Sequence, residues 1–213
     1  FDPHWRESFF FELHDPDAGP AGDAVFFTMA HYPVSERMDS LQMGRVGGQQ
    51  LIGQLQRPYA GDPHTPAVPG SSVEIVRPFE EIRLRADPAK APIGLDLTFR
   101  ARTQPYGLRR GTIKHRGETI WDQAHILQSG SYQGTYTVNG AARRVDGWLG
   151  QRDHSWGVRN HARCPLWIWF QIQLADGFLG VWHWELKDGS PIYTDGCWAP
   201  ADRGEPVPVV GFD

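Results

Sequence analysis

The chain has 213 residues, 40% hydrophobic and 22% charged, a composition typical of one large globular domain or two small ones. Its formal net charge of -4 leaves no excess of lysine and arginine to meet phosphates, which argues against a nucleic-acid partner. No apolar run reaches the length of a membrane span, and we expect no signal peptide. Two cysteines without CxxC spacing are typical of a reducing compartment, so we expect a cytoplasmic protein.

Strand patterns follow one another along the chain, beginning with Phe9–Leu13 and Ala24–Tyr32 on either side of a loop rich in Asp, Pro and Gly. The segment Arg37–Leu51 does not qualify as a helix, because glycines interrupt it. Ser72–Ala86 and Ile93–Gln104 come next, and the second alternates apolar with polar residues, as a strand with one buried face does. No long segment has helical periodicity, so the sequence predicts an all-β protein.

Two tight turns complete the strand pattern. Asn139-Gly140 is a strong hairpin signal, and Asp176-Gly177 predicts a second hairpin. We expect an antiparallel meander of about ten strands, closed or nearly closed into a β-barrel, because closure removes exposed strand edges. We expect a seam near Tyr132 that divides the chain into residues 1–131, a first barrel half, and residues 132–213, the start of a second half.

The second hairpin carries four tryptophans. With a two-residue turn at Asp176-Gly177, Ala175 pairs with Phe178, and alternation sorts the flanking residues onto two faces. One face holds Trp167, Trp169, Gln171, Gln173, Trp182 and Trp184. The other holds Ile168, Phe170, Ile172, Leu174, Val181, His183 and Glu185, and is typical of ordinary packing. Four indoles beside two glutamine amides fit either the wall of a half-polar ligand cavity or a solid barrel core, and both interpretations stay open.

The segment Gly147–His161 concentrates titratable groups beside tryptophans. Strand alternation separates Asp153 and Ser155 from the residues of the opposite face, which are Trp148, Arg152, His154 and Trp156. In one interpretation, Asp153 or His154 is a general acid or base at the rim of an apolar pocket. Desolvation there favours the neutral, proton-donating form of a carboxyl group, and indole faces stabilise a cation that develops on the ligand.

Two other interpretations of this segment remain. In the first, His154, His161 and His183 bind a metal together with Asp153 or Cys164, although their spacing matches no known ligand motif. In the second, Arg152 and Asp153 form a buried ion pair that fixes a corner of the barrel. We therefore expect no metal and no cofactor at this site.

The residues "GQRDHSWGVR" (Gly150–Arg159) followed by "WIWFQIQLADG" (Trp167–Gly177) resemble the superfamily of hydroxyneurosporene synthases (carotenoid 1,2-hydratases) and AttH-like proteins. The similarity is greatest to uncharacterised bacterial members, and the opening Trp5–Pro16 is similar to their N-terminal part. The resemblance implies two lipocalin-like (calycin-like) β-barrel halves, of which this chain covers the first and the beginning of the second. It also implies a pocket for an isoprenoid or polycyclic ligand, with Asp153, His154, Trp156 and Gly157 as the matching positions.

Two functional hypotheses follow. The first is a cofactor-independent hydratase, isomerase or cyclase, which protonates a double bond of a terpenoid-like or polycyclic substrate. Asp153 is its proton donor and His154 the partner of Asp153. The substrate-binding residues of this hypothesis are Trp148, Arg152, Trp156, Trp167, Trp169, Gln171, Trp182 and Trp184. The second hypothesis is a non-catalytic lipocalin-like carrier of a hydrophobic small molecule. Both hypotheses are compatible with a homo-oligomer.

Overall fold

The computed structural model describes residues 2–59, 65–160, 166–209 and 211. Within these residues the chain forms one 3₁₀ helix, η1 (Gly19–Ala21), and sixteen strands. The strands are β1 (Trp5–His14), β2 (Ala24–Tyr32), β3 (Arg37–Val46), β4 (Gln49–Pro58), β5 (Ala67–Val68), β6 (Ser71–Arg77), β7 (Glu81–Ala86), β8 (Gly94–Ala101), β9 (Tyr106–Gly107), β10 (Gly111–His115), β11 (Glu118–Val138), β12 (Ala141–Arg159), β13 (Leu166–Gln173), β14 (Gly177–Glu185), β15 (Pro191–Pro200) and β16 (Val207–Pro208). The all-β prediction is confirmed. No helix in the described part of the chain is long and apolar enough to cross a membrane.

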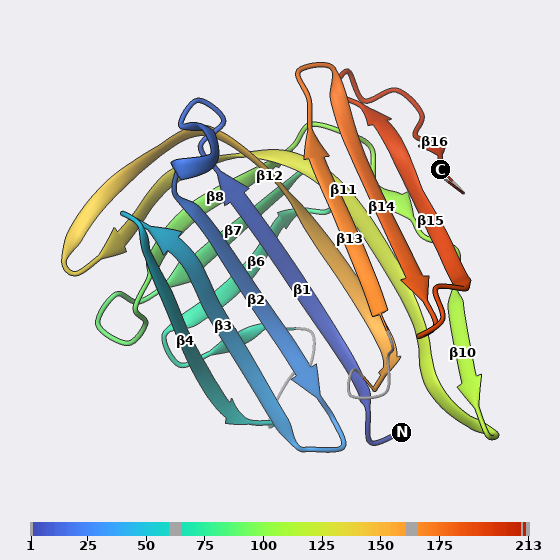
Figure 1. The fold of residues 1–213 in the computed structure, drawn as a ribbon. Coiled ribbons are helices and arrows are strands. Elements are labelled where there is room, and N and C mark those ends of the chain that lie inside the picture. The colour runs from blue at the N-terminus through green and yellow to red at the C-terminus, as the bar shows by residue number, and fades with distance from the viewer. Residues whose placement is uncertain (1, 60–64, 161–165, 210, 212–213) are drawn as a thin grey trace.

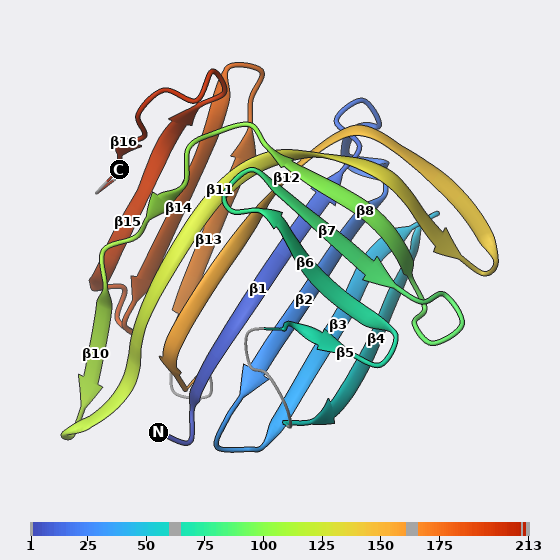
Figure 2. The same ribbon diagram turned by 180° about the vertical axis from the view of Figure 1, so that it is seen from behind.

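The strands form two antiparallel sheets (Figures 1 and 2). The larger has the order β4-β3-β2-β1-β12-β11-β8-β7-β6-β5, with β9 and β10 paired to β11. The smaller has the order β13-β14-β15-β16. Ser72–Ala86 is not a single strand, because a turn that contains Pro78 separates β6 from β7, and proline has no N–H to donate to a ladder.

The larger sheet curls into a nearly closed barrel. Its two ends meet where the hydroxyl groups of Ser40 and Ser71 lie 2.8 Å apart and Arg57 Nε donates to the carbonyl oxygen of Ala67 at 2.8 Å. Alternate residues of the strands fill the interior, among them Phe11, Phe27 and Phe99, which are fully buried. The residues in between point outward, and those on β1, β2 and β3 form the surface on which the functional site is built.

Two long strands connect the two sheets. β11 pairs with β12 from Trp121 to Val138, and the two strands arch over the molecule from β8 towards β13 (Figures 1 and 2). The predicted hairpin between them is confirmed, since Val138 pairs with Ala141, and Asn139 and Gly140 have φ angles of 52° and 78°. Two positive φ angles are the mark of a type I′ turn. The predicted boundary between residues 131 and 132 falls inside β11, beside a β-bulge at Tyr132, and stays a prediction.

The tryptophan hairpin differs from its predicted register. Leu174 pairs with Gly177 through backbone hydrogen bonds, so the turn residues are Ala175 and Asp176, and Trp169 lies opposite Trp182. This register differs from the expected one by two residues, and an even shift leaves every side chain on its predicted face. The tryptophan face is therefore confirmed as a shared surface of β13 and β14.

The opposite face of β13 is not the packed surface that its sequence suggests. Phe170, Ile172 and Leu174 are 41%, 43% and 45% exposed. β13 is also the edge strand of the smaller sheet. Hydrophobic alternation identifies two faces of a strand, but it does not tell which of two apolar faces meets a neighbouring layer.

Candidate functional site

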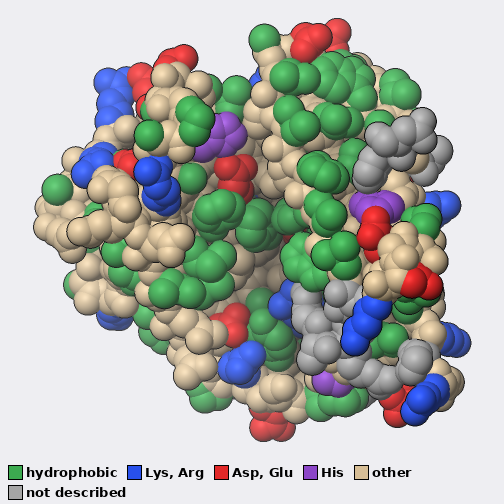
Figure 3. All heavy atoms as spheres, in the orientation of Figure 1, with side chains coloured by type: hydrophobic (Ala, Val, Ile, Leu, Met, Phe, Trp, Pro, Cys, Tyr) green, Lys and Arg blue, Asp and Glu red, His purple; other side chains and the backbone are tan. Residues whose placement is uncertain are grey.

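A cavity of about 420 Å³ lies between the two sheets. The outward residues of β1, β2 and β3 form one side of it, including Phe10, Phe26 and Leu41. The ends of β11 and β12 that lie near β13 form a second side, and the tryptophan face of the β13–β14 hairpin forms a third. Figure 3 shows this face of the molecule hollowed near its middle, with hydrophobic side chains around the hollow.

Three of the four hairpin tryptophans line the cavity. The ring of Trp182 stacks between Trp167 and Trp169, with centroid distances of 5.3 and 5.1 Å. The indole N–H groups of Trp169 and Trp182 are buried and have no hydrogen-bond partner among the described residues. The wall therefore offers apolar ring faces together with donors that a ligand oxygen could satisfy.

The other three predicted members of this face, Gln171, Gln173 and Trp184, do not line the cavity. Gln173 accepts a hydrogen bond from the hydroxyl of Ser129 and donates one to the carbonyl oxygen of Gly150. Trp184 is 1% exposed and packs edge-on against Trp121 at 5.0 Å and stacks on Tyr193 at 4.3 Å. It belongs to the core between β11 and the smaller sheet. Both amide atoms of Gln171 are buried without a hydrogen-bond partner in the described part of the chain, but the residue does not line the cavity.

Asp153 lies at the cavity wall and is 5% exposed. It is located on β12 between Phe10 of β1 and Leu127 of β11. Its Oδ2 atom is 3.0 Å from Nε2 of His125, and its Oδ1 atom accepts a 3.4 Å hydrogen bond from the hydroxyl of Ser155. A carboxyl group and an imidazole in contact, both buried beside an apolar cavity, are suited to move a proton to and from a ligand.

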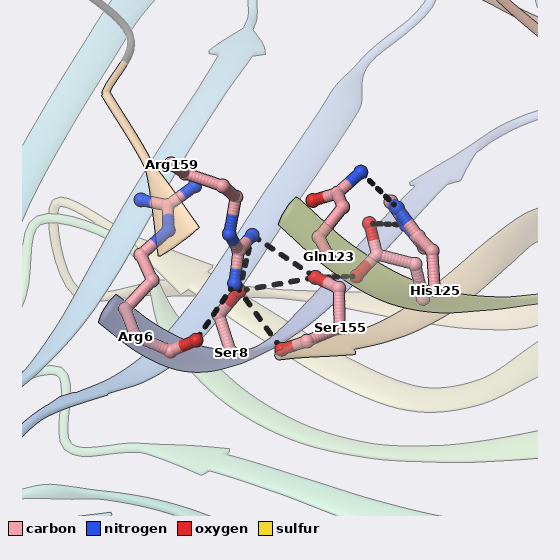
Figure 4. Close-up of polar contacts among 7 residues, drawn as sticks. Arg6, Ser8, Gln123, His125, Ser155 and Arg159 are labelled. Carbon is pink, nitrogen blue, oxygen red and sulfur yellow. Dashed lines mark hydrogen bonds and ion pairs between the residues drawn. The ribbon is translucent and has the colours of Figure 1, made fainter. Parts of the chain in front are cut away.

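His125 is held in place by Gln123 and the indoles. Nε2 of Gln123 lies 3.3 Å from Nδ1 of His125 (Figure 4). The rings of Trp182 and Trp169 lie edge-on to the imidazole at 4.8 and 6.0 Å. With the amide N–H donating to Nδ1, the imidazole proton is on Nε2, the nitrogen that lies 3.0 Å from Oδ2 of Asp153. The amide oxygen of Gln123 is buried without a partner in the described residues, so a turned amide would accept from Nδ1–H instead. Gln123 can therefore hydrogen-bond either tautomer of His125.

The structure does not bring His154 to Asp153. Its ring stacks on Phe9 at 4.2 Å and its Nε2 atom is 2.8 Å from Oε1 of Glu7, on the opposite face of β12. Successive residues of a strand point to opposite sides, so Asp153 and His154 cannot share one substrate from the same surface. The histidine that contacts Asp153 comes instead from the neighbouring strand β11.

Trp148, Arg152 and Trp156 share the face of His154 and do not line the cavity. Trp148 packs inside the first barrel. Arg152 donates two hydrogen bonds to Oε1 of Gln128, and burial lowers the pKa of its guanidinium to about 10. Trp156 is 36% exposed. The expected ion pair between Arg152 and Asp153 is absent from the described residues, because the two side chains point to opposite faces.

The residues of the metal interpretation lie apart. His183 contacts the hydroxyl of Thr194 and Oε1 of Glu185, each at 2.8 Å, whereas His154 contacts Glu7. His161 and Cys164 lie outside the described residues. Among the residues that are described, no group of three or more His, Cys, Asp and Glu side chains is arranged to hold a metal ion.

Sequence reasoning missed the residues that β11 contributes. In "WDQAHILQ", the side chains of Trp121, Gln123, His125 and Leu127 alternate, and three of these four line the cavity. The alternation of these side chains is visible in the sequence, but the sequence does not show which residues lie opposite them on the neighbouring strands. Arg159, which lies 4 residues beyond Ser155 on the same face of β12, also belongs to the cavity wall.

Residues 1–205 match the family described as "Domain of unknown function (DUF7064)". The chain belongs to this family. No curated protein matches the sequence.

Solved structures with the same fold include a protein of Nitrosomonas europaea provisionally called AttH, with a TM-score of 0.69 and 12% identity. The match covers 98% of this chain and 69% of the Nitrosomonas protein. Kievitone hydratase from Nectria haematococca has a TM-score of 0.63 and 10% identity, over 96% of this chain and 64% of the hydratase. At such low identity, these similarities establish only that this chain has the lipocalin-like fold.

Proposed function

We propose that the protein is a cofactor-independent hydratase, isomerase or cyclase that protonates a double bond of a terpenoid-like or polycyclic substrate. The observation that carries this proposal is the 3.0 Å contact between Asp153 and His125 at the wall of a cavity lined by indoles. The shared fold with a hydratase supports hydration as the first reaction to test. We also propose that the protein belongs to the hydroxyneurosporene synthase superfamily.

The chemistry begins with the neutral carboxyl group of Asp153. Its proton adds to one carbon of the double bond, so that a C–H bond forms, the π bond breaks and a carbocation remains on the other carbon. The faces of Trp167, Trp169 and Trp182 stabilise that cation, because an indole ring attracts positive charge over its face. In hydration, water attacks the cation and gives up a proton to the Asp153 carboxylate. In isomerisation or cyclisation, the cation loses a neighbouring proton to it instead.

His125 is the positioning residue for this acid. It contacts the oxygen of Asp153 that Ser155 does not, and it can exchange a proton with the carboxyl group while the substrate reacts. The alternative function is a carrier, in which Asp153 and His125 only tie β12 to β11 and the cavity holds its ligand unchanged. The burial of both groups at a ligand-sized cavity is compatible with either function, so turnover must decide between them.

The experiment compares Asp153→Asn, His125→Gln and His154→Gln in a panel of unsaturated terpenoids, polycyclic compounds and kievitone, with product analysis by mass spectrometry. Asp153→Asn and His125→Gln are expected to reduce kcat by about 10²–10⁴-fold with retained ligand binding. His154→Gln is the matched control, because its side chain lies on the other face of the same strand, and should stay within about twofold of the parent. Equal turnover in Asp153→Asn and the parent would exclude Asp153 as the acid.

A further inference from the structure

One end of the cavity carries a buried cation, Arg159. Its side chain is 7% exposed and folds back along β12. Nη1 donates to the hydroxyl groups of Ser155 and Ser8 at 3.1 and 3.3 Å. Nη2 donates to the carbonyl oxygens of Arg6 and Ser155, both at 3.2 Å (Figure 4). All four acceptors are neutral oxygens.

The charge of Arg159 is poorly compensated within the protein. In the described part of the chain Arg159 makes no ion pair, and its Nε atom is buried without a hydrogen-bond partner. Asp153 is the acid that acts on it electrostatically, but the oxygens of Asp153 face His125 and Ser155. Burial, and then repulsion from Arg6, lower the pKa of the Arg159 guanidinium to about 9. A buried cation without a counter-ion is costly. Unlike Arg152, which is also buried, Arg159 lines the cavity, where a charged ligand can reach it.

Much of the remaining cavity wall is apolar. Phe10, Phe26, Leu41 and Met43 line it on the side of β1–β3, and the indoles of the hairpin line it opposite. Of the acids of this wall, Asp39 is paired with Arg37 at 3.4 Å and Asp153 contacts His125 at 3.0 Å, whereas Arg6 adds a second cation to the wall. A ligand that fits this distribution has a hydrophobic body and one anionic end. A neutral hydroxyl or carbonyl group could satisfy the Nε donor, but it would leave the charge of the guanidinium unmatched.

We infer that the ligand of this cavity is an organic acid, a hydrophobic skeleton whose carboxylate is bound by Arg159. The inference rests on the proposed function in taking this cavity as the substrate site. Ser155, which bonds Arg159, is two residues from Asp153 on β12, a separation of about 7 Å along a strand. The hydroxyl of Ser155 lies between the two groups, 3.1 Å from Nη1 of Arg159 and 3.4 Å from Oδ1 of Asp153, so the carboxylate of the substrate is bound close to the acid.

The test uses two probes that differ only in charge, 1-naphthylacetate and 1-naphthylacetamide, titrated into the whole protein by calorimetry at pH 7. The acid is expected to bind at least tenfold more tightly than the amide. Arg159→Gln should remove this preference and leave the affinity for the amide unchanged. Arg159→Lys, which keeps a positive charge, should retain part of it. Arg152→Gln is the matched control, because Arg152 is also buried but lies on the opposite face of β12, and it should keep the full preference.

Binding of the two probes by the parent protein is enough to contradict the inference, even if a variant fails to fold. Equal binding of acid and amide, or binding of neither at millimolar concentration, contradicts it. A preference that survives in Arg159→Gln contradicts it as well. Asp153→Asn separates the two proposals: this variant should lose turnover and still prefer the acid. If the parent protein does not prefer the acid but Asp153→Asn still abolishes turnover, only the inference is refuted. If the parent prefers the acid but Asp153→Asn keeps full turnover, only the proposed catalysis is refuted.

Discussion

Replacement of Arg159 by methionine is expected to change the free energy of unfolding by no more than about 2 kcal/mol, although the residue is buried. The pKa of about 9, against an ordinary value of 12.5, corresponds to about 5 kcal/mol against the charged form. The four hydrogen bonds of Arg159, 3.1–3.3 Å long, each stabilise the folded state by about 1 kcal/mol. The two contributions nearly cancel. Methionine fills most of the volume and brings no charge, while Ser8 and Ser155 keep their own contact at 3.4 Å.

Urea unfolding followed by tryptophan fluorescence measures this change. A second measurement uses pH. Because the folded-state pKa of Arg159 is lowered, the unfolded chain holds the proton more tightly above pH 9, so the parent gains stability as the pH rises. Relative to Arg159→Met, the parent should gain about 1.4 kcal/mol between pH 8 and pH 10. Every other titrating group is common to both proteins, which makes the variant its own control.

A destabilisation of more than about 4 kcal/mol in Arg159→Met would refute this reasoning, since it would identify Arg159 as a structural brace whose hydrogen bonds outweigh its desolvation. A difference between parent and variant that does not depend on pH would show that the guanidinium is not desolvated as its burial indicates.

Four further substitutions test the packing of β12, β13 and β14. Gly157→Ala should cost at least about 2 kcal/mol in urea unfolding. Gly157 has a φ of 132°, and a Cβ atom there would lie 2.1 Å from the carbonyl oxygen of Asp122. Unchanged stability would show that β12 can relax. Trp182→Ala should cost about 3–5 kcal/mol and Trp167→Ala about 1–2 kcal/mol, because the first ring is 5% and the second 39% exposed. Similar losses in thermal melts would contradict the difference in burial. Ile172→Thr should change stability by less than about 0.5 kcal/mol, and a larger loss would show that the outer face of β13 is covered in solution.

The sequence by itself determined the class of fold and the faces of its strands. Period-two alternation depends only on neighbouring residues, which is why the tryptophan face was predicted correctly even though the turn lies at Ala175-Asp176. Asn139-Gly140 likewise carries its turn type locally, since both residues tolerate positive φ. The same rule separates Asp153 from Arg152 and His154, its neighbours in sequence.

Only the tertiary structure decided which residues meet across the strands. Asp153 contacts His125 because β11 and β12 pair in one particular register, and no local pattern specifies that register. The fold-back of Arg159 onto Ser8 depends on β1 pairing with β12, between residues 151 positions apart. The sheet that the indoles face was also undetermined, because both faces of β13 are apolar. Contacts of this kind are fixed by the packing of whole sheets, where each pairing buries surface that a single strand cannot bury alone.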